Sequence, residues 1–114
     1  MWHNGLIKEH CIKDLQKITN STSNWDTSLL LNYIEQGHDL SEVDGSFACV
    51  IINPELQIFR NAISPLFIDD DMSISSVRFN GATPLPVGTV FTILPEGLGV
   101  TNKTFTTKNN PFML

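Results

Sequence analysis

The chain has 114 residues, of which 41% are hydrophobic and 17% are charged, and its formal net charge is −5. These values are typical of one globular domain with a modest core, and they exclude a disordered or fibrous protein. Nucleic acid is not expected as a partner, because phosphate binding needs clustered Lys and Arg and the seven basic residues are scattered. No apolar run approaches the roughly 20 residues of a membrane span, and no signal-peptide pattern opens the chain, so we expect a cytoplasmic protein without membrane contact.

The first predicted element is an amphipathic helix over residues 6–19. Ile7, Cys11, Leu15 and Ile18 recur at helical spacing with Lys and Asp residues between them, which predicts one buried stripe. The polar run "NSTSN" that follows ends this helix.

A second helix is predicted over residues 26–37. Asp26, or its neighbour Asn24, is expected to cap the first free N–H groups, and Gly37 is a natural stop. Its apolar stripe comprises Leu29, Leu30, Tyr33 and Ile34.

The remainder of the chain changes to the period of β-strands. Strands are predicted over residues 46–52, 56–62, 65–70, 73–79 and 88–94, the first of them buried on both faces. Residues 101–114 are interpreted as either an edge strand or a tail. The fold class is therefore α+β, with two N-terminal helices followed by an antiparallel β meander in a single domain, residues 1–114.

The chemical inventory of the residues indicates no enzyme by itself. The three histidines are far apart without carboxylates at metal-ligand spacing, so we expect neither a metal nor a cofactor. The acidic run 69–71 is interpreted as a solvated hairpin turn rather than a cation site. Cys11 and Cys49 show no metal or redox spacing, and we expect both to be buried free thiols. Neither a Gly-x-Ser-x-Gly nucleophile motif nor a Gly-rich phosphate loop occurs.

The order of several short motifs carries more information. "HNG", "DT", "DGSFACVI", "FRNAISPLFI", "ISSVRF" and "LPVGTVFTI" follow one another between residues 3 and 94. This order resembles the glutaminase domain of class II glutamine amidotransferases, which are N-terminal-nucleophile (Ntn) hydrolases. The family pattern runs as His-Asn-Gly, Asp-Thr-Glu, Gly-x-Phe-Ala, Arg-Asp, Pro-Leu, Ala-Ser-Glu and Pro-Gly-x-Val. The resemblance implies that the fold is part of the Ntn-hydrolase αββα sandwich.

The same resemblance implies roles for four residues. Asn4 and Gly5 match the pair that forms the oxyanion hole, which stabilises the tetrahedral intermediate of amide hydrolysis. Asp26 matches the aspartate that holds the α-amino group of glutamine, although a helix-capping role would explain it equally. Ser76, in the segment that matches Ala-Ser-Glu, is assigned to substrate binding. We therefore expect weak glutamine binding at most.

Departures from the family pattern argue against catalysis. Ser28, Asn61 and Val77 stand where the family has carboxylates. The family also places its catalytic Cys at the N-terminus, well before His-Asn-Gly, and follows it with a glutamine-binding Arg. Cys11 and Cys49 are internal and carry no free α-amine to act as the base, so we expect no glutaminase activity from this chain alone.

Three hypotheses remain. The first is a catalytically inactive amidotransferase-like protein, a pseudoenzyme, that acts through contacts with a protein partner or as a homodimer. The second is one part of an active amidotransferase whose N-terminal Cys lies on another chain or is missing from this sequence. An upstream reading frame that starts Met-Cys-Gly would favour it. The third is a structural α+β domain whose motif matches are accidental.

Overall fold

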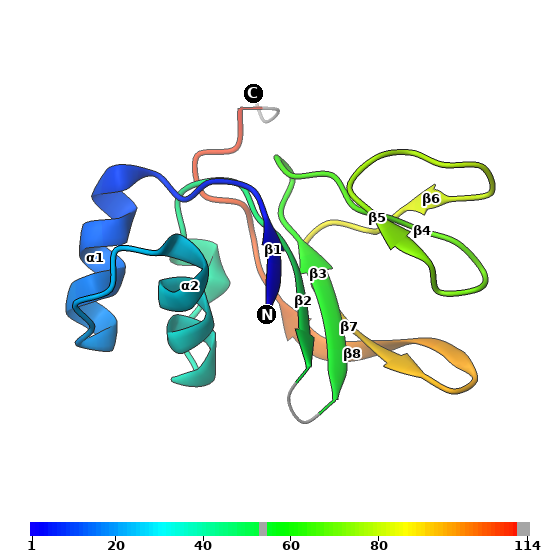
Figure 1. Cartoon of the computed structure of the whole chain (residues 1–114), viewed down its shortest axis with the longest axis horizontal. Coiled ribbons are helices and arrows are strands. Elements are labelled where there is room, and N and C mark those ends of the chain that lie inside the picture. The colour runs from blue at the N-terminus through cyan, green and yellow to red at the C-terminus, as the bar shows by residue number, and fades with distance from the viewer. Residues whose placement is uncertain (53–54, 112–114) are drawn as a thin grey trace.

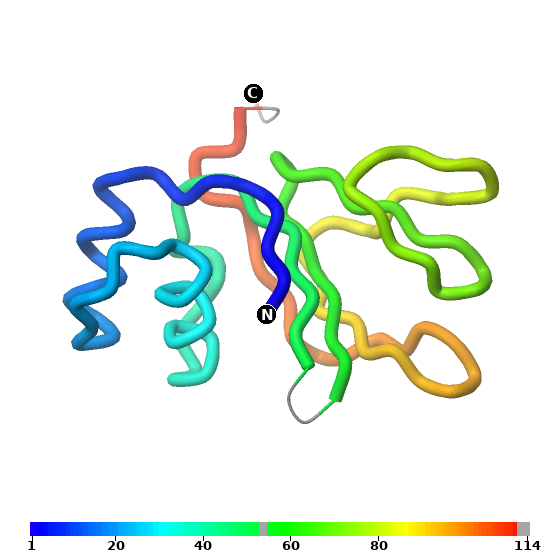
Figure 2. The backbone as a smooth tube through the Cα atoms, in the orientation of Figure 1, coloured from blue at the N-terminus to red at the C-terminus, as the bar shows by residue number. Residues whose placement is uncertain are grey.

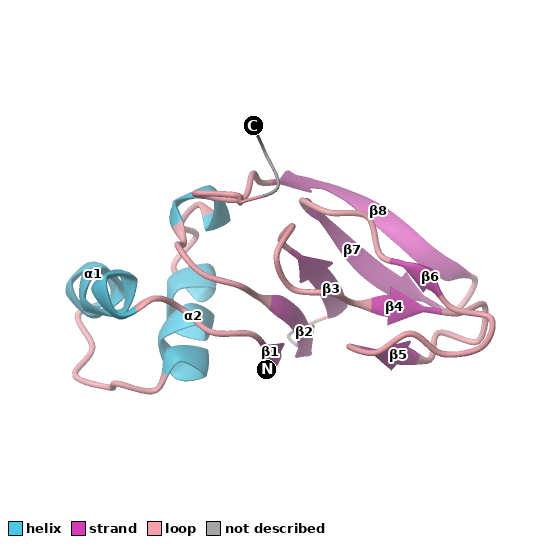
Figure 3. Ribbon diagram, turned by 90° about the horizontal axis from the view of Figure 1, so that it is seen from above, coloured by secondary structure: helices cyan, strands magenta, loops and turns pink. Residues whose placement is uncertain are grey.

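The protein folds into three layers (Figure 1). The structure is a computed structural model that describes residues 1–52 and 55–111. Two helices cover one face of a five-stranded sheet, and a three-stranded sheet lies on the other side (Figure 3). The expected α+β class is therefore confirmed. Among the described residues, no helix is long and apolar enough to cross a membrane.

The helices and strands follow one another along the chain in this order: β1 Trp2–Asn4, α1 Glu9–Thr19, α2 Asp26–Glu35, the short 3₁₀ helix η1 Leu40–Glu42, β2 Ala48–Ile52, β3 Leu56–Arg60, β4 Phe67–Ile68, β5 Ile74–Ser75, β6 Thr83–Pro84, β7 Thr89–Leu94 and β8 Gly97–Thr104.

The strands divide between two sheets rather than forming the single meander expected from the sequence. The larger sheet has the order β1-β2-β3-β7-β8 and the smaller one β5-β4-β6, and all the pairs are antiparallel. Figure 2 shows how the chain leaves β3, builds the small sheet as an excursion and returns as β7. The excursion supplies a cover for the face of the large sheet that the helices leave open.

The core has two parts, one on each face of the large sheet. The buried residues of the helix-facing part are Ile7, Cys11, Leu15, Leu29, Leu30, Tyr33, Leu40, Val43, Phe47, Cys49, Ile51, Phe59, Val90 and Phe105. Those between the two sheets are Ala48, Ile58, Leu66, Ile68, Leu85 and Phe91. Alternate residues of β2 and β3 therefore enter different parts of the core, as the period of a strand requires.

Helix α1 ends at Thr19 as predicted but differs from its prediction at its start and in its buried stripe. It begins at Glu9 rather than at residue 6, because Ile7 forms a β-bridge with Gly45. The stripe continues from Leu15 to Thr19, which is buried and donates its hydroxyl proton to the Leu15 carbonyl at 2.6 Å. Ile18, expected in the stripe, is 48% exposed, because the buried positions recur at every fourth residue here.

Helix α2 confirms the predicted stripe but not the predicted cap. Leu29, Leu30 and Tyr33 are buried, and Ile34 packs against them. Trp25, and not Asp26 or Asn24, occupies the N-cap position, where no side chain caps the helix. Asp26 is instead the first helical residue, where its charge favours the helix dipole.

The predicted strands are present but shorter. β2 has buried residues on both faces, as expected: Ala48, Cys49 and Ile51 are buried and Val50 is partly buried, whereas Ile52 at its end is 78% exposed. The acidic hairpin turn is confirmed, because Asp69 Oδ1 accepts backbone N–H groups of Asp71 at 3.0 Å and Ser73 at 2.8 Å. These bonds are internal to the turn and account for the aspartate at position 69.

Two strands and half of a third were not predicted. β1 and β6 contain three and two residues, too few to show a period. β8 begins at Gly97, ahead of the predicted segment 101–114, and forms an edge of the large sheet as far as Thr104. Phe105 then enters the helix-facing core. The end of that segment, residues 112–114, lies outside the described residues.

Candidate functional site

Two of the sequence motifs lie against each other at one end of the large sheet. Gly5, which follows β1, has φ +136°, and a Cβ at this position would lie 2.1 Å from the Ser46 carbonyl oxygen. Gly45 has φ +148°, and its Cβ would lie 2.7 Å from the Ile7 Cα. Only glycine fits at either position, because the two backbones approach too closely for a side chain.

Hydrogen bonds join these two segments. The Ser46 N–H donates to the Leu6 carbonyl at 3.0 Å, and the Leu6 N–H donates to Ser46 Oγ at 2.9 Å. A third segment is attached through Ser64, whose hydroxyl donates to the Asn4 carbonyl at 2.9 Å.

Asn61 is the buried centre of the same region. Its side chain is fully buried, and Oδ1 accepts the N–H groups of Phe47 at 3.2 Å, Ile63 at 3.2 Å and Ser64 at 3.3 Å. Its Nδ2 donates to the Gly45 carbonyl at 2.8 Å. One amide therefore satisfies three donors and one acceptor of the backbone, which a carboxylate could not do without a proton.

The start of α2 completes the arrangement. His3 Nδ1 lies 3.3 Å from Thr27 Oγ1, and His3 Nε2 lies 3.4 Å from the Ser46 carbonyl oxygen. Asp26 Oδ1 accepts the Thr27 hydroxyl at 3.4 Å, and Oδ2 accepts the Ile7 N–H at 3.5 Å. The four segments His3–Ile7, Asp26–Thr27, Gly45–Phe47 and Asn61–Ser64, which we call the motif cluster, are thus bonded into one unit.

The residues assigned by resemblance are distributed unevenly around this cluster. Asp26 approaches the backbone just after Gly5, on the helix side of the sheet. Asn4 pairs with Ala48, which belongs to the core between the sheets, so its side chain points to the opposite face from His3. No described residue bonds the Asn4 side-chain amide. Ser76 follows β5 in the small sheet, away from α2 (Figure 1).

Arg60 shares the face of Asn4, since both residues pair with Ala48. Its Nε donates to the Leu85 carbonyl at 2.6 Å and its Nη1 to the Ser64 carbonyl at 3.5 Å. Burial of the guanidinium lowers the pKa of Arg60. The side chain therefore ties the loops on either side of the small sheet to the motif cluster.

Both cysteines are buried free thiols, as predicted. Burial raises the pKa of Cys49 strongly, and burial also raises the pKa of Cys11, where the hydrogen bond from the Asp44 N–H to Sγ at 3.3 Å only partly opposes it. Thiols of raised pKa in the core are poor nucleophiles, because the reactive form is the thiolate.

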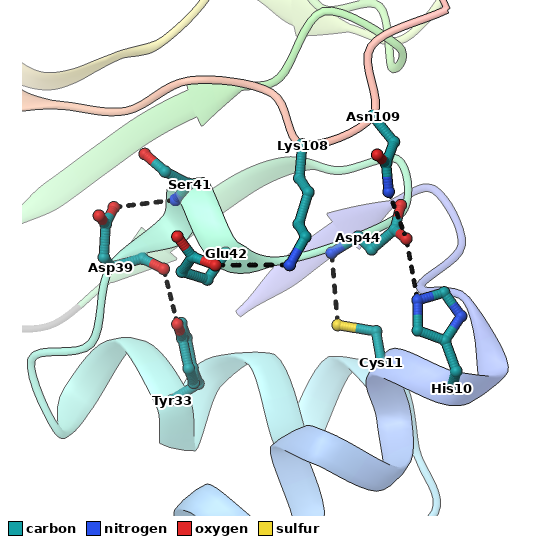
Figure 4. A network of polar contacts seen from close by, with 9 residues as sticks. All are labelled: His10, Cys11, Tyr33, Asp39, Ser41, Glu42, Asp44, Lys108 and Asn109. Carbon is teal, nitrogen blue, oxygen red and sulfur yellow. Dashed lines mark hydrogen bonds and ion pairs between the residues drawn. The ribbon is translucent and has the colours of Figure 1, made fainter.

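A buried carboxylate lies beside the cluster (Figure 4). Asp44 pairs with Lys8 at 3.0 Å and His10 at 2.9 Å, and it accepts the Asn109 side-chain N–H at 2.9 Å. Burial of the carboxyl opposes ionisation, but the contacts with Lys8, Asn109 and His10 outweigh it and hold the pKa of Asp44 below its usual value. This group anchors the C-terminal segment to the start of α1.

Sequence reasoning missed the roles of Asn61, Arg60 and Asp44. The only signal was the polar character of residues in or next to predicted strands, which does not distinguish a buried polar group from an exposed one. Within residues 1–52 and 55–111, no three His, Cys, Asp or Glu side chains are grouped as metal ligands. Comparison with protein-family models, curated proteins and solved structures gives no match to this chain.

Proposed function

We propose that this chain is a non-catalytic relative of the class II amidotransferase glutaminase domain and acts through contacts with other protein chains. The observation that supports this relationship to the family is the motif cluster. Segments that match family motifs but lie up to 60 residues apart, such as Asn4 and Ser64, bond to one another in one place. Motif matches that arise by chance are not expected to lie next to one another in the fold. Their contact in one place therefore favours a real relationship to the family over accidental matches.

The absence of catalysis is supported by the chemistry of the cluster. Neither cysteine is an accessible thiolate, and Asp26 already accepts a backbone N–H and the Thr27 hydroxyl. Asn61, where the family has an aspartate, uses its amide hydrogen to hold Gly45. We propose that Asn61 stabilises the fold and takes no part in a reaction.

Protein contact is supported by the open edge of β1. This strand is paired on one side only, with β2, and its other side faces no described strand. Trp2 on β1 is 45% exposed, and Leu6 and Trp25, which flank the contact between Ile7 and Asp26, are 71% and 64% exposed. Unpaired strand edges beside large apolar side chains favour pairing with another strand. We propose that a second copy of this chain supplies that strand.

Sedimentation velocity at micromolar concentration tests the dimer. The wild type is expected to sediment as a concentration-dependent dimer, and Trp2→Lys is expected to be monomeric because a charge on an edge strand opposes pairing. Val100→Lys is the matched control, because Val100 is 73% exposed on β8 at the opposite edge. A wild type that stays monomeric over the whole range would contradict the proposed assembly.

Ammonia release from glutamine tests the lack of catalysis. We expect no turnover above a heat-treated control at high protein concentration, and turnover that survives replacement of Cys11 and Cys49 would overturn the proposal. Calorimetry with millimolar glutamine measures the weak binding expected from Asn4 and Asp26. No heat at that concentration would remove glutamine as a ligand of the motif cluster.

A further inference from the structure

A second site lies at the other end of α2 from the motif cluster. A cavity of about 320 Å³ opens between the C-terminal end of this helix, the segment before η1 and strands β3, β7 and β8. The helix has ten residues, so its two ends are about 15 Å apart. The cavity volume is at the lower end of the range for small-molecule sites, about 300 to 1,000 Å³.

The apolar part of the cavity lining, which we call its floor, belongs to the helix-facing core or packs against it. It includes Ile34 of α2, Phe59 of β3 and Val90 of β7, which belong to or pack against the helix-facing core. Phe59 also contacts Phe105 edge-to-face, with ring centroids 6.0 Å apart. An apolar ligand group that enters here would replace water against these side chains.

Tyr33 holds two residues that line the cavity, His38 and Asp39. Its hydroxyl donates to the Asp39 carbonyl at 2.6 Å (Figure 4), and its ring lies against the His38 ring at a centroid distance of 5.0 Å. The Asp39 carboxylate uses Oδ1 to accept the Ser41 N–H at 2.9 Å. Asp39 is therefore positioned by the protein, and its Oδ2 has no hydrogen-bond partner among the described residues.

Strand β8 also contributes to the lining, through Lys103. Thr101 fixes the backbone there, since its hydroxyl donates to the Val90 carbonyl at 2.6 Å and accepts the Lys103 N–H at 3.2 Å. Over the described ranges, neither the Lys103 ammonium nor the side-chain amide of Gln57, which also lines the cavity, has a hydrogen-bond or ion-pair partner. The Lys103 ammonium and the Gln57 amide at the cavity are thus able to bind polar groups of a ligand.

We propose that this cavity binds a free α-amino acid with an apolar side chain. The side chain occupies the floor formed by Ile34, Phe59 and Val90. The carboxylate of the ligand pairs with the Lys103 ammonium, and its ammonium group pairs with Asp39. A cation and an anion on one rim complement a zwitterion, whereas a ligand with a single charge leaves one of them unpaired. The proposal does not rest on the amidotransferase kinship, because no motif-cluster residue lines the cavity.

The experiment is a titration of the full chain with L-phenylalanine, followed by heteronuclear NMR and calorimetry. We expect saturable shifts at the residues that line the cavity, with millimolar or tighter affinity. Hydrocinnamate, which lacks the ammonium group, and phenethylamine, which lacks the carboxylate, are expected to bind at least about tenfold more weakly, since each forfeits one ionic hydrogen bond.

Two conservative variants locate the site. Lys103→Met keeps the length of the side chain, and Asp39→Asn keeps the bond to the Ser41 N–H, so both are expected to fold. Each should weaken L-phenylalanine binding by about tenfold or more. Lys13→Met and Asp70→Asn remove exposed charges outside the cavity and should leave the affinity unchanged.

Several results would overturn the proposal. They are the lack of L-phenylalanine binding at millimolar concentration, binding that resists either Lys103→Met or Asp39→Asn, and equally tight binding of either analogue. Circular dichroism of each variant verifies that a loss of binding is not a loss of fold.

Discussion

The replacement Asn61→Ala tests the buried centre of the motif cluster. Alanine removes an amide that is fully buried and bonded only to backbone groups. Three N–H groups, those of Phe47, Ile63 and Ser64, lose their acceptor, and the Gly45 carbonyl loses its donor. None of these groups gains a substitute partner from the alanine side chain.

The expected loss of stability follows from the number of hydrogen bonds that the Asn61 side chain makes. Each hydrogen bond contributes about 1 kcal/mol net, so the four bonds of Asn61 contribute about 4 kcal/mol, and unpaired buried donors add to the loss. A domain of 114 residues has a total free energy of unfolding of about 6 to 17 kcal/mol. Asn61→Ala is therefore expected to remove between about a quarter and about two thirds of the free energy of unfolding.

Urea unfolding followed by far-ultraviolet circular dichroism measures this loss. Asn80→Ala, at an exposed turn position in the small-sheet excursion, is the matched control and should change the stability by less than about 0.5 kcal/mol. If Asn61→Ala loses no more than this control, the network around Asn61 does not stabilise the fold as its geometry indicates.

The replacement Asn61→Asp tests the hydrogen bond that the Asn61 amide donates, separately from those that it accepts. The carboxylate retains an acceptor for the three N–H groups, but it places an oxygen where Nδ2 now lies 2.8 Å from the Gly45 carbonyl oxygen. We expect a loss of about 1 kcal/mol or more at neutral pH, because two acceptors would face each other in a buried position. An aspartate variant as stable as the wild type would refute the assignment of the amide as a donor to Gly45.

Three further predictions concern neighbouring residues. Gly5→Ala should destabilise the fold by about 3 kcal/mol, because a Cβ meets the Ser46 carbonyl oxygen and φ is positive; a calorimetric midpoint equal to the wild type would contradict this. The lowered pKa of Asp44 means that its contribution to stability is complete above the unfolded pKa of about 3.9 and is lost as the pH falls through the lower folded value. Urea midpoints of wild type and Asp44→Asn should therefore converge on acidification, and a constant difference would refute the role of this charge. Cys49 should react with a thiol reagent only after unfolding, because it is fully buried with a raised pKa, and modification of the native protein at this residue would disprove that placement.

Long periodic segments were predictable from the sequence. The stripe of α2 and the strands β2, β3 and β7 were predicted because an apolar repeat directs side chains to one face or buries both faces regardless of what lies beyond. The boundary errors came from tertiary contacts. Ile7 has a helical spacing with Cys11 but pairs with Gly45, and this pairing delays the start of α1.

The roles of single polar residues were not predictable. Asn61 lies near the end of the predicted strand 56–62, and no local property shows that its amide is buried among backbone groups of its own neighbours and of the distant segment Gly45–Phe47. Residues of β1 and β6 form strands only because β2 and β4 provide partners for them. The cavity at the end of α2 likewise combines Ile34, Phe59 and Lys103 from distant parts of the chain.

The sequence by itself determined the α+β class, the order of most elements, the motifs and the burial of both cysteines, because these depend on composition and on periods within one segment. Only the tertiary structure decided that the strands form two sheets, that the motif segments meet, and that an apolar cavity is rimmed by Lys103 and Asp39. These features depend on which distant segments pack against each other. The free energy of that packing comes from contacts between segments, so it cannot be read from any single stretch of the sequence.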